Sequence, residues 1–382
     1  YSKYQKEQDY PLHYRKENLD NAKEELILNL PIMAKGENYF SLGDKSVSEN
    51  NQFLAYSIDR VSRREYTIHI KDLKTGKILE DKILNTTGGI TWANDNKTIF
   101  YTKKDTITLR SSQIFRHTLG TDSSEDILVF EEKDDTFSCF VYKTKSSKYL
   151  MIGSYQTLST EYQFLDANDP LGKWQILQAR EKNIEYSVSH FDDKFYILTN
   201  WEAKNFRLMQ TSINSTEKNN WQEVIAHRKD VLLRGVDIFK NYLVVNERSE
   251  GLSKSRVINW QDNSEYYITF NDPSYSLYSS SNLEFDTDVF RFVYSSLTTP
   301  RSVYDYNMLT QERTLLKQKT VLGGEFESDN YASERLFALS RDGKTKIPIS
   351  LVYRKGLKKN GEGPLLLNGY GSYGNSSDPY FS

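Results

Sequence analysis

The residues best suited to chemistry lie near the end of the sequence, in Asn368-Gly-Tyr-Gly-Ser-Tyr-Gly374. Glycines at 369, 371 and 374 permit positive φ angles and a close approach of the backbone to a ligand. A tyrosine hydroxyl held in such a loop can donate a hydrogen bond to the oxyanion that develops during acyl transfer. A plain glycine-rich turn is the alternative interpretation. The GxGxxG spacing alone is weak evidence for a nucleotide site.

Paired carboxylates form a second candidate, in Glu131-Glu-Lys-Asp-Asp135. Asp134 and Asp135 could serve a glycosidase, which uses two carboxyl groups on either side of the scissile bond. Neighbouring residues of a strand point to opposite faces, so these two acids cannot flank one bond. We therefore favour a solvated turn or an ion pair between sheets. Ser62-Arg-Arg-Glu-Tyr66 is too short for a nucleic-acid contact and is offset by nearby acids, so we expect an ion pair at a blade edge there.

Other catalytic and metal-binding patterns are missing from the sequence. The five histidines are widely spaced and form no H-x-E or H-E-x-x-H motif, and the single cysteine, Cys139, excludes an internal disulfide and any multi-cysteine metal site. We predict a buried Cys139, no metal site and no cofactor. No G-x-S-x-G nucleophile elbow occurs either, so the sequence contains no complete catalytic constellation.

Composition narrows the class of protein. The 382 residues include 50 Lys and Arg against 52 Asp and Glu, and this balance argues against nucleic acid as a partner. Aromatic residues make up 13% of the chain, too many for a disordered protein. No apolar run approaches the roughly 20 residues of a spanning helix, so we expect no membrane partner. The length fits two to three domains or one large repeat domain.

A polar turn followed by an apolar strand recurs along the sequence. The first large apolar residues after these turns are 46 to 50 residues apart: Phe53, Ile99, Tyr149, Phe195, Tyr242, Phe290 and Leu336. Each interval contains several short segments rich in Val, Ile, Tyr, Phe and Thr. Four strands in 40–50 residues is the size of one β-propeller blade. We expect the aromatic side chains to pack between stacked blades.

The two ends of the sequence depart from this pattern. Residues 1–42 predict a hairpin that opens an additional blade, with a helix or irregular turn over Asn18–Leu30 capped by Asp20. After Leu336, Lys346–Tyr353 and Pro364–Leu367 predict strands, the second leading into the glycine cluster as at a functional strand end of an α/β sheet. We place a domain boundary near residue 325 and expect the sequence to be part of a longer protein.

Segments along most of the chain resemble the oligopeptidase B (protease II) branch of the prolyl oligopeptidase family of serine peptidases. The resemblance is carried by these stretches: Ser62–Tyr66, Trp92–Asp95, Gln113–His117, Glu131–Thr136, Lys204–Phe206, Tyr294–Ser296, Ser350–Tyr353 and Gly369–Gly374. It implies an all-β, seven-bladed propeller over residues 1–325, followed over 326–382 by the first strands of an incomplete α/β-hydrolase domain. Residues 1–42 would then supply the first blade.

The resemblance also implies a function. Such enzymes hydrolyse short peptides after Arg or Lys, and the propeller limits access to a Ser-Asp-His triad, which would lie beyond Ser382. The 382-residue chain alone would then be inactive, and its partners would be short peptides and the rest of the hydrolase domain. Tyr370 matches an oxyanion-hole tyrosine. Asp378 matches the first of two acids that favour basic substrate residues, but Tyr380 replaces the second.

Alternatives stay open at this point. The chain could be a propeller that binds partners without chemistry, a prolyl-specific oligopeptidase, or a glycosidase that uses acids such as Asp134. The single cysteine favours a cytoplasmic location, with the periplasm as the alternative. The sequence does not predict whether the protein is a monomer or a homo-oligomer.

Overall fold

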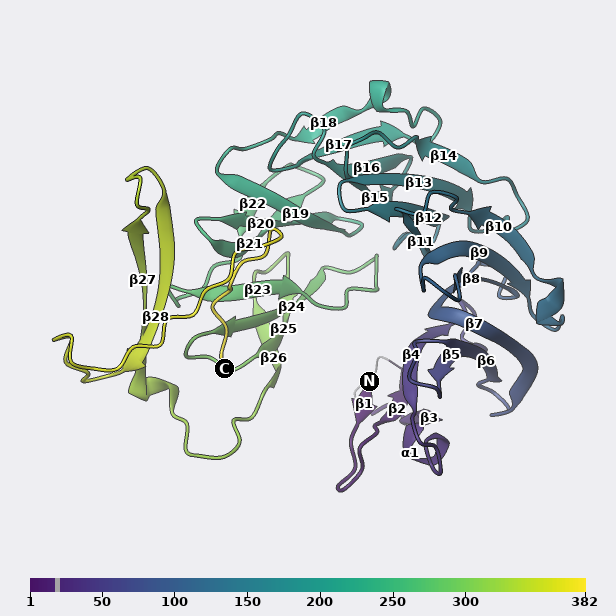
Figure 1. Ribbon diagram of the computed structural model, residues 1–382, viewed down its shortest axis with the longest axis horizontal. Helices are drawn as coiled ribbons and strands as arrows, with labels where there is room; N and C mark the ends of the chain where they lie inside the picture. Colours follow the sequence, from purple (N-terminus) through teal and green to yellow (C-terminus); the bar gives the residue numbers. More distant parts are fainter. Residues whose placement is uncertain (18–20) are drawn as a thin grey trace. The chain divides into compact units, whose positions relative to one another are not determined.

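The computed structural model describes residues 1–17 and 21–382, which form two compact units, Tyr1–Glu185 and Tyr186–Ser382 (Figure 1). Antiparallel strands dominate both units, and in every sheet the strands follow one another in sequence order. The described helical segments are short: α1 (Leu30–Met33), η1 (Ser123–Glu125), η2 (Lys218–Asn220) and η3 (Ser328–Asn330). No helix in the described part of the chain is long and apolar enough to cross a membrane.

The first unit contains three sheets. The three-stranded sheet consists of β1 (Ser2–Lys3), β2 (Leu12–Arg15) and β3 (Glu25–Asn29). The seven-stranded sheet consists of β4 (Ser41–Val47), β5 (Phe53–Asp59), β6 (Tyr66–Asp72), β7 (Ile78–Trp92), β8 (Thr98–Lys104), β9 (Ser111–Thr118) and β10 (Ile127–Glu131). The four-stranded sheet consists of β11 (Ser138–Lys143), β12 (Tyr149–Gln156), β13 (Ser159–Asp166) and β14 (Gln175–Gln178).

The second unit contains three four-stranded sheets and a hairpin. The first sheet consists of β15 (Tyr186–Phe191), β16 (Lys194–Thr199), β17 (Arg207–Ser212) and β18 (Gln222–Ile225). The second consists of β19 (Val231–Ile238), β20 (Tyr242–Ser249), β21 (Leu252–Asn259) and β22 (Glu265–Tyr267). The third consists of β23 (Tyr275–Ser279), β24 (Val289–Ser296), β25 (Ser302–Asn307) and β26 (Arg313–Gln318), and the hairpin pairs β27 (Tyr331–Leu339) with β28 (Lys346–Arg354).

The recurring apolar strand of the sequence is the second strand of a four-strand repeat. Strands β5, β8, β12, β16, β20 and β24 hold the first six of the spaced residues, and each of these strands is mostly buried. Because side chains on both faces of these strands are buried, the strands read as continuous apolar runs instead of alternating ones. The last strands of the four-stranded sheets, such as β26, are mostly exposed and carry a weaker pattern.

The polar turns before these strands contain residues with left-handed backbone conformation. Asn51, Asn96, Ser147 and Asp192 have φ angles of 59°, 59°, 57° and 56°. Asn and Asp tolerate this conformation better than other residues with a side chain. The turn chemistry therefore explains why the repeat is visible in the sequence.

Aromatic side chains pack between consecutive sheets, as predicted. In the first unit Phe100 of β8 meets Trp174, which precedes β14, edge to face at 5.7 Å between ring centroids. In the second unit Phe191 of β15 stacks on Trp260, which follows β21, at 5.4 Å. Aromatic pairs at such distances add to the free energy of burial. The aromatic surplus thus stabilises the contacts between blades.

The fold is an all-β propeller with five blades, formed by the four four-stranded sheets and the seven-stranded sheet, and the expectation of seven blades is wrong for this structure. One reason is β7, a 15-residue strand that pairs with β6 at one end and with β8 at the other, so that two predicted repeats merge into one sheet. The other reason is that residues 1–42 supply only three strands.

Two predictions for the ends of the chain need correction. Over the described residues 21–30, strand β3 replaces most of the expected helix or irregular turn, because Ile27 and Leu28 enter the core beside β2, and only Leu30 is helical, as the first residue of α1. Asp20 lies outside the described residues. The strand expected at Pro364–Leu367 is an exposed coil with no neighbouring strand to bond. Residues 326–382 therefore contain the antiparallel hairpin β27–β28 and an irregular tail, and the described residues hold no α/β-hydrolase domain.

Candidate functional site at the C-terminal segment

The glycine–tyrosine segment is an exposed turn. The side chains of Tyr370 and Tyr373 are 58% and 96% exposed, and Tyr373 and Gly374 have positive φ angles. The amide of Asn375 donates to the carbonyl of Ser372 across the turn at 3.0 Å. No contact in the described part of the chain engages the Tyr370 hydroxyl, which is therefore accessible to a ligand. The oxyanion role of Tyr370 stays a prediction.

Asp378, eight residues after Tyr370, is held by side chains of two blades. Its two carboxylate oxygens accept from the two terminal nitrogens of Arg248 at 2.5 and 2.8 Å, and the hydroxyl of Tyr278 donates to one of them. Arg248 lies at the end of β20 and Tyr278 in β23. The side chains of Arg248 and Asp378 are each 11% exposed, so the ion pair is largely shielded from water.

The residues that follow Asp378 continue this contact. The Ser276 hydroxyl donates to the carbonyl of Pro379 at 3.0 Å, and the amide of Phe381 donates to the Ser295 hydroxyl at the same distance. The Phe381 ring meets Phe326 edge to face at 4.7 Å. In Figure 1 this tail is the yellow trace that returns from β28 towards β20 and ends beside β23. Residues 378–381 are thus fixed to strands β20, β23 and β24.

The electrostatics of Asp378 favour its ionised form. Burial alone would raise the pKa of this carboxyl group, but the hydrogen bonds from Arg248 and Tyr278 and the positive charge of Arg248 lower it. Burial and the hydrogen bond to Asp378 in turn raise the pKa of Tyr278 to about 12. At neutral pH the Asp378 carboxyl group is therefore ionised and the Tyr278 hydroxyl is protonated.

A cavity of about 520 Å³ adjoins the docked tail. Its lining comes from β23, β24, the segment after β26 and the tail: Ser276, Tyr278, Val293, Ser295, Pro300, Arg301, Lys319, Thr320, Val321, Leu322, Tyr380, Phe381 and Ser382. The lining is mostly apolar, with Arg301 and Lys319 as its charged members. Ligand sites commonly have this composition.

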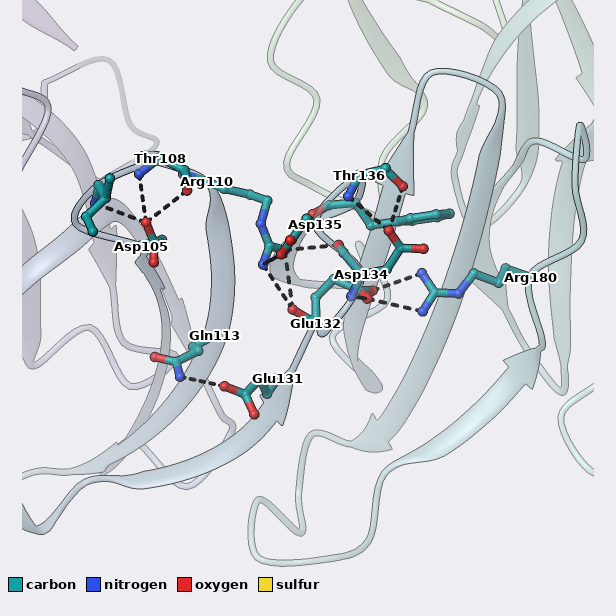
Figure 2. A network of polar contacts seen from close by, with 12 residues as sticks. Asp105, Thr108, Arg110, Gln113, Glu131, Glu132, Asp134, Asp135, Thr136 and Arg180 are labelled. Carbon is teal, nitrogen blue, oxygen red and sulfur yellow. Dashed lines mark hydrogen bonds and ion pairs between the residues drawn. The ribbon is translucent and has the colours of Figure 1, made fainter.

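The paired acids of the sequence belong to a structural network in the first unit (Figure 2). Glu132 is buried in the loop between β10 and β11, and its carboxylate accepts from both terminal nitrogens of Arg180 at 3.1 Å, from the Ser154 hydroxyl and from the Asp134 amide at 2.9 Å. Ser154 lies in β12, so the loop, the seven-stranded sheet and the next sheet are joined. The expected ion pair between sheets is confirmed.

The two aspartates of this loop do not form a catalytic pair. Asp134 accepts from the amide and hydroxyl of Thr136 at 2.9 and 2.7 Å, as in a solvated turn, and the side chain of Asp135 is 96% exposed. Arg110 closes the loop from outside by donating to the carbonyl of Phe137 at 2.8 Å. Arg63 and Glu65 form an ion pair at 3.8 Å in the turn between β5 and β6.

His117, one of the five widely spaced histidines, lies in a buried polar cluster. Its Nδ1 is 2.7 Å from a carboxylate oxygen of Asp126 and its Nε2 is 3.0 Å from one of Asp81, while the Tyr101 hydroxyl donates to Asp126 at 2.7 Å. His117 is fully buried, so this cluster cannot reach a substrate. In the described ranges, no group of three or more His, Cys, Asp or Glu side chains is placed to hold a metal ion. Cys139 is buried, as predicted.

The structure does not bring the two predicted site residues together: Tyr370 is exposed, and Asp378 is engaged by Arg248. Sequence reasoning missed Arg248 and Tyr278, which lie 130 and 100 residues before Asp378. A charged residue at the end of a buried strand is the one signal that could have indicated Arg248.

The comparisons with known proteins place this architecture in a family. The profile described as "Prolyl oligopeptidase, N-terminal beta-propeller domain" matches residues 1–319. The chain belongs to the prolyl oligopeptidase family. A solved member, oligopeptidase B from Leishmania major, has a TM-score of 0.90 and 32% identity, with 100% of this chain and 55% of that chain covered.

Relatives in the prolyl oligopeptidase family carry the names of peptidases. Dipeptidyl aminopeptidase BI of Pseudoxanthomonas mexicana is 38% identical, with 100% of this chain and 54% of the relative covered. Protease 2 of Moraxella lacunata is 34% identical, with 100% and 55% covered. The chain spans about half the length of these curated relatives and corresponds to the propeller part of the family.

Proposed function

We propose that the chain is the access-limiting propeller of a serine oligopeptidase that hydrolyses short peptides after Arg or Lys. The observation that carries this proposal is the match of the whole chain to about half of the peptidases named above. In a serine peptidase, a Ser activated by His and Asp attacks the peptide carbonyl. The triad and an α/β-hydrolase domain would belong to the longer protein, with the triad beyond Ser382.

Tyr370 is the proposed catalytic contribution of this chain. Its exposed hydroxyl, on a turn with little side-chain bulk, can donate to the oxyanion of the tetrahedral intermediate. In a longer form of the protein, Tyr370→Phe should lower kcat by ~10²–10³, the usual effect of losing one oxyanion donor. Tyr373→Phe is the matched control, because Tyr373 lies in the same turn and is also exposed. An unchanged kcat for Tyr370→Phe would refute this role.

The substrate preference is tested with fluorogenic peptide amides on the longer protein. Cleavage after Arg or Lys, with little after Pro and none of glycosides, is the expected result. Preferred cleavage after Pro would replace the proposal with the prolyl-specific alternative. The 382-residue chain alone should show no turnover, and measurable turnover would contradict the assignment of the triad to residues beyond Ser382.

A dipeptidyl aminopeptidase activity is the second candidate, and the 38% identity to an enzyme of that name favours it. An enzyme of this kind needs a free amino terminus two residues before the scissile bond. Matched Xaa-Arg amides with free and blocked amino termini separate the two candidates. Equal cleavage of both supports the oligopeptidase.

A further inference from the structure

The tail after the glycine cluster is attached to the propeller at an isolated site. Between hairpin β27–β28 and Asp378, residues 355–377 are almost entirely exposed. At Asp378 the exposure falls abruptly, and the contacts with Arg248, Tyr278, Ser276 and Ser295 begin. The contacts of the tail with the propeller are therefore concentrated at residues 378–381.

Hairpin β27–β28 contacts the propeller near the same end of β20. The turn between β20 and β21 contains Glu250 and Gly251, and Arg335 of β27 donates to the Glu250 carbonyl at 2.5 Å. A Cβ atom on Gly251, whose φ is +76°, would lie 2.7 Å from Nη2 of Arg335 and 2.8 Å from Cγ of Pro348. Arg248 donates to the carbonyl of Gly251 as well as to Asp378. The end of β20 therefore connects the hairpin and the tail.

The Asp378 carboxylate has little capacity left for a ligand. Each oxygen already accepts from one nitrogen of Arg248, and one of them also accepts from Tyr278. A bidentate arginine–carboxylate pair fixes orientation as well as distance. Three of its roughly four acceptor positions are occupied, and the side chain is only 11% exposed, so Arg248 is the main ionic partner of Asp378 in this structure.

We propose that Arg248 and Tyr278 form a clasp for Asp378 that fixes the segment carrying Tyr370 to the propeller. In this assignment Arg248 and Asp378 are positioning residues, and Asp378 does not contact substrate. The clasp itself follows from contacts within the chain, whereas its effect on turnover rests on the proposed function.

The first test does not depend on activity and uses the 382-residue chain. Hydrogen exchange of the Phe381 amide, which donates to Ser295, should accelerate about tenfold or more in Arg248→Gln, because a charge-assisted bidentate bond is lost. Arg248→Lys should restore part of the protection, since it keeps the charge but not the fork. Lys240→Gln is the control, because it removes the exposed ion pair of the same unit with Asp286. Unchanged exchange in Arg248→Gln would refute the clasp.

The second test uses the longer protein and two substrates, an Arg-Arg amide and a Gly-Arg amide. The clasp predicts that Arg248→Gln and Asp378→Asn lower kcat for both substrates by the same factor, and that the double variant is no worse than either single one. A loss confined to Asp378→Asn and to the Arg-Arg substrate would overturn the inference and assign Asp378 to substrate. If the unaltered enzyme cleaves neither substrate, the proposed function fails, and hydrogen exchange still decides the clasp.

Discussion

At the scale of single residues, Glu132 shows how this fold accommodates a buried charge. Burial alone would raise the pKa of its carboxyl group, but hydrogen bonds from Arg180, Ser154 and the Asp134 amide and the charge of Arg180 lower it. A buried carboxylate with these partners is costly to disturb, because the remaining donors lose their acceptor inside the protein.

We therefore predict that Glu132→Gln destabilises the chain by about 2 kcal/mol, the usual range for a lost hydrogen bond to a charged group. Asp135→Asn, in the same loop but almost fully exposed, should change the free energy of unfolding by less than about 0.5 kcal/mol. Urea unfolding of both variants measures the difference. Equal stability of the two variants would show that the Glu132 network is dispensable.

The His117 cluster gives the chain a defined pH dependence. Burial by itself lowers the pKa of His117, but the hydrogen bonds and charges of Asp126 and Asp81 outweigh it and raise the pKa above 6.5. A group whose pKa is higher in the folded state stabilises that state fully below its unfolded pKa, and the stabilisation is lost as the pH rises through the folded pKa.

His117→Gln should therefore be destabilising at pH 6 by a larger amount than at pH 9. The difference in free energy of unfolding between the variant and the unaltered chain should shrink as the pH rises above 6.5. Urea titrations across this range measure it. A difference that grows with pH would mean that His117 is neutral in the folded protein.

At the scale of elements, β12 is an example of tight packing on one face of a strand. In β12, Gly153 lies under the ring of Phe140 in β11, and a Cβ atom there would be 2.4 Å from Cζ of that ring. The ring also contacts Tyr155 at 5.5 Å between centroids. The missing side chain therefore creates the space for an aromatic cluster on this sheet.

Gly153→Ala should destabilise the chain by about 1–3 kcal/mol, the typical cost of overpacking. Gly89→Ala in β7 is the matched control, because nothing lies within 4 Å of a Cβ atom at that position. Thermal unfolding of the two variants tests the expectation, and a Gly153→Ala variant as stable as the control would contradict it.

The elements also show where prediction from sequence succeeds. Strands such as β12 and β20 were predictable because burial on both faces produces an apolar run after a turn with Asn, Asp or Ser. The merging of two repeats through β7 could not be predicted, because it depends on how the strands pair. Thr86 pairs with Tyr66 of β6 and also with Lys103 of β8. The Arg248–Asp378 contact was equally hidden, because its two residues are 130 positions apart. The strand predicted at Pro364–Leu367 is wrong because an apolar composition does not by itself supply a strand to pair with.

At the scale of the whole molecule, the proposed function assigns different roles to two parts of a longer enzyme. The propeller described above would restrict entry and fasten the segment with Tyr370, and the remainder would supply the nucleophile. We expect no catalytic role for the acidic residues of the blades, because Glu132 binds Arg180 and Asp134 accepts hydrogen bonds within its own turn. The propeller is therefore expected to act through access and positioning.

Labelling with a fluorophosphonate, which reacts with activated serines, tests this central claim most directly. We predict labelling of the longer protein at a single serine beyond Ser382, with loss of peptide-amide hydrolysis in proportion, and no labelling of the 382-residue chain. Labelling at a serine within residues 1–382, or peptidase activity that survives complete labelling, would contradict the account.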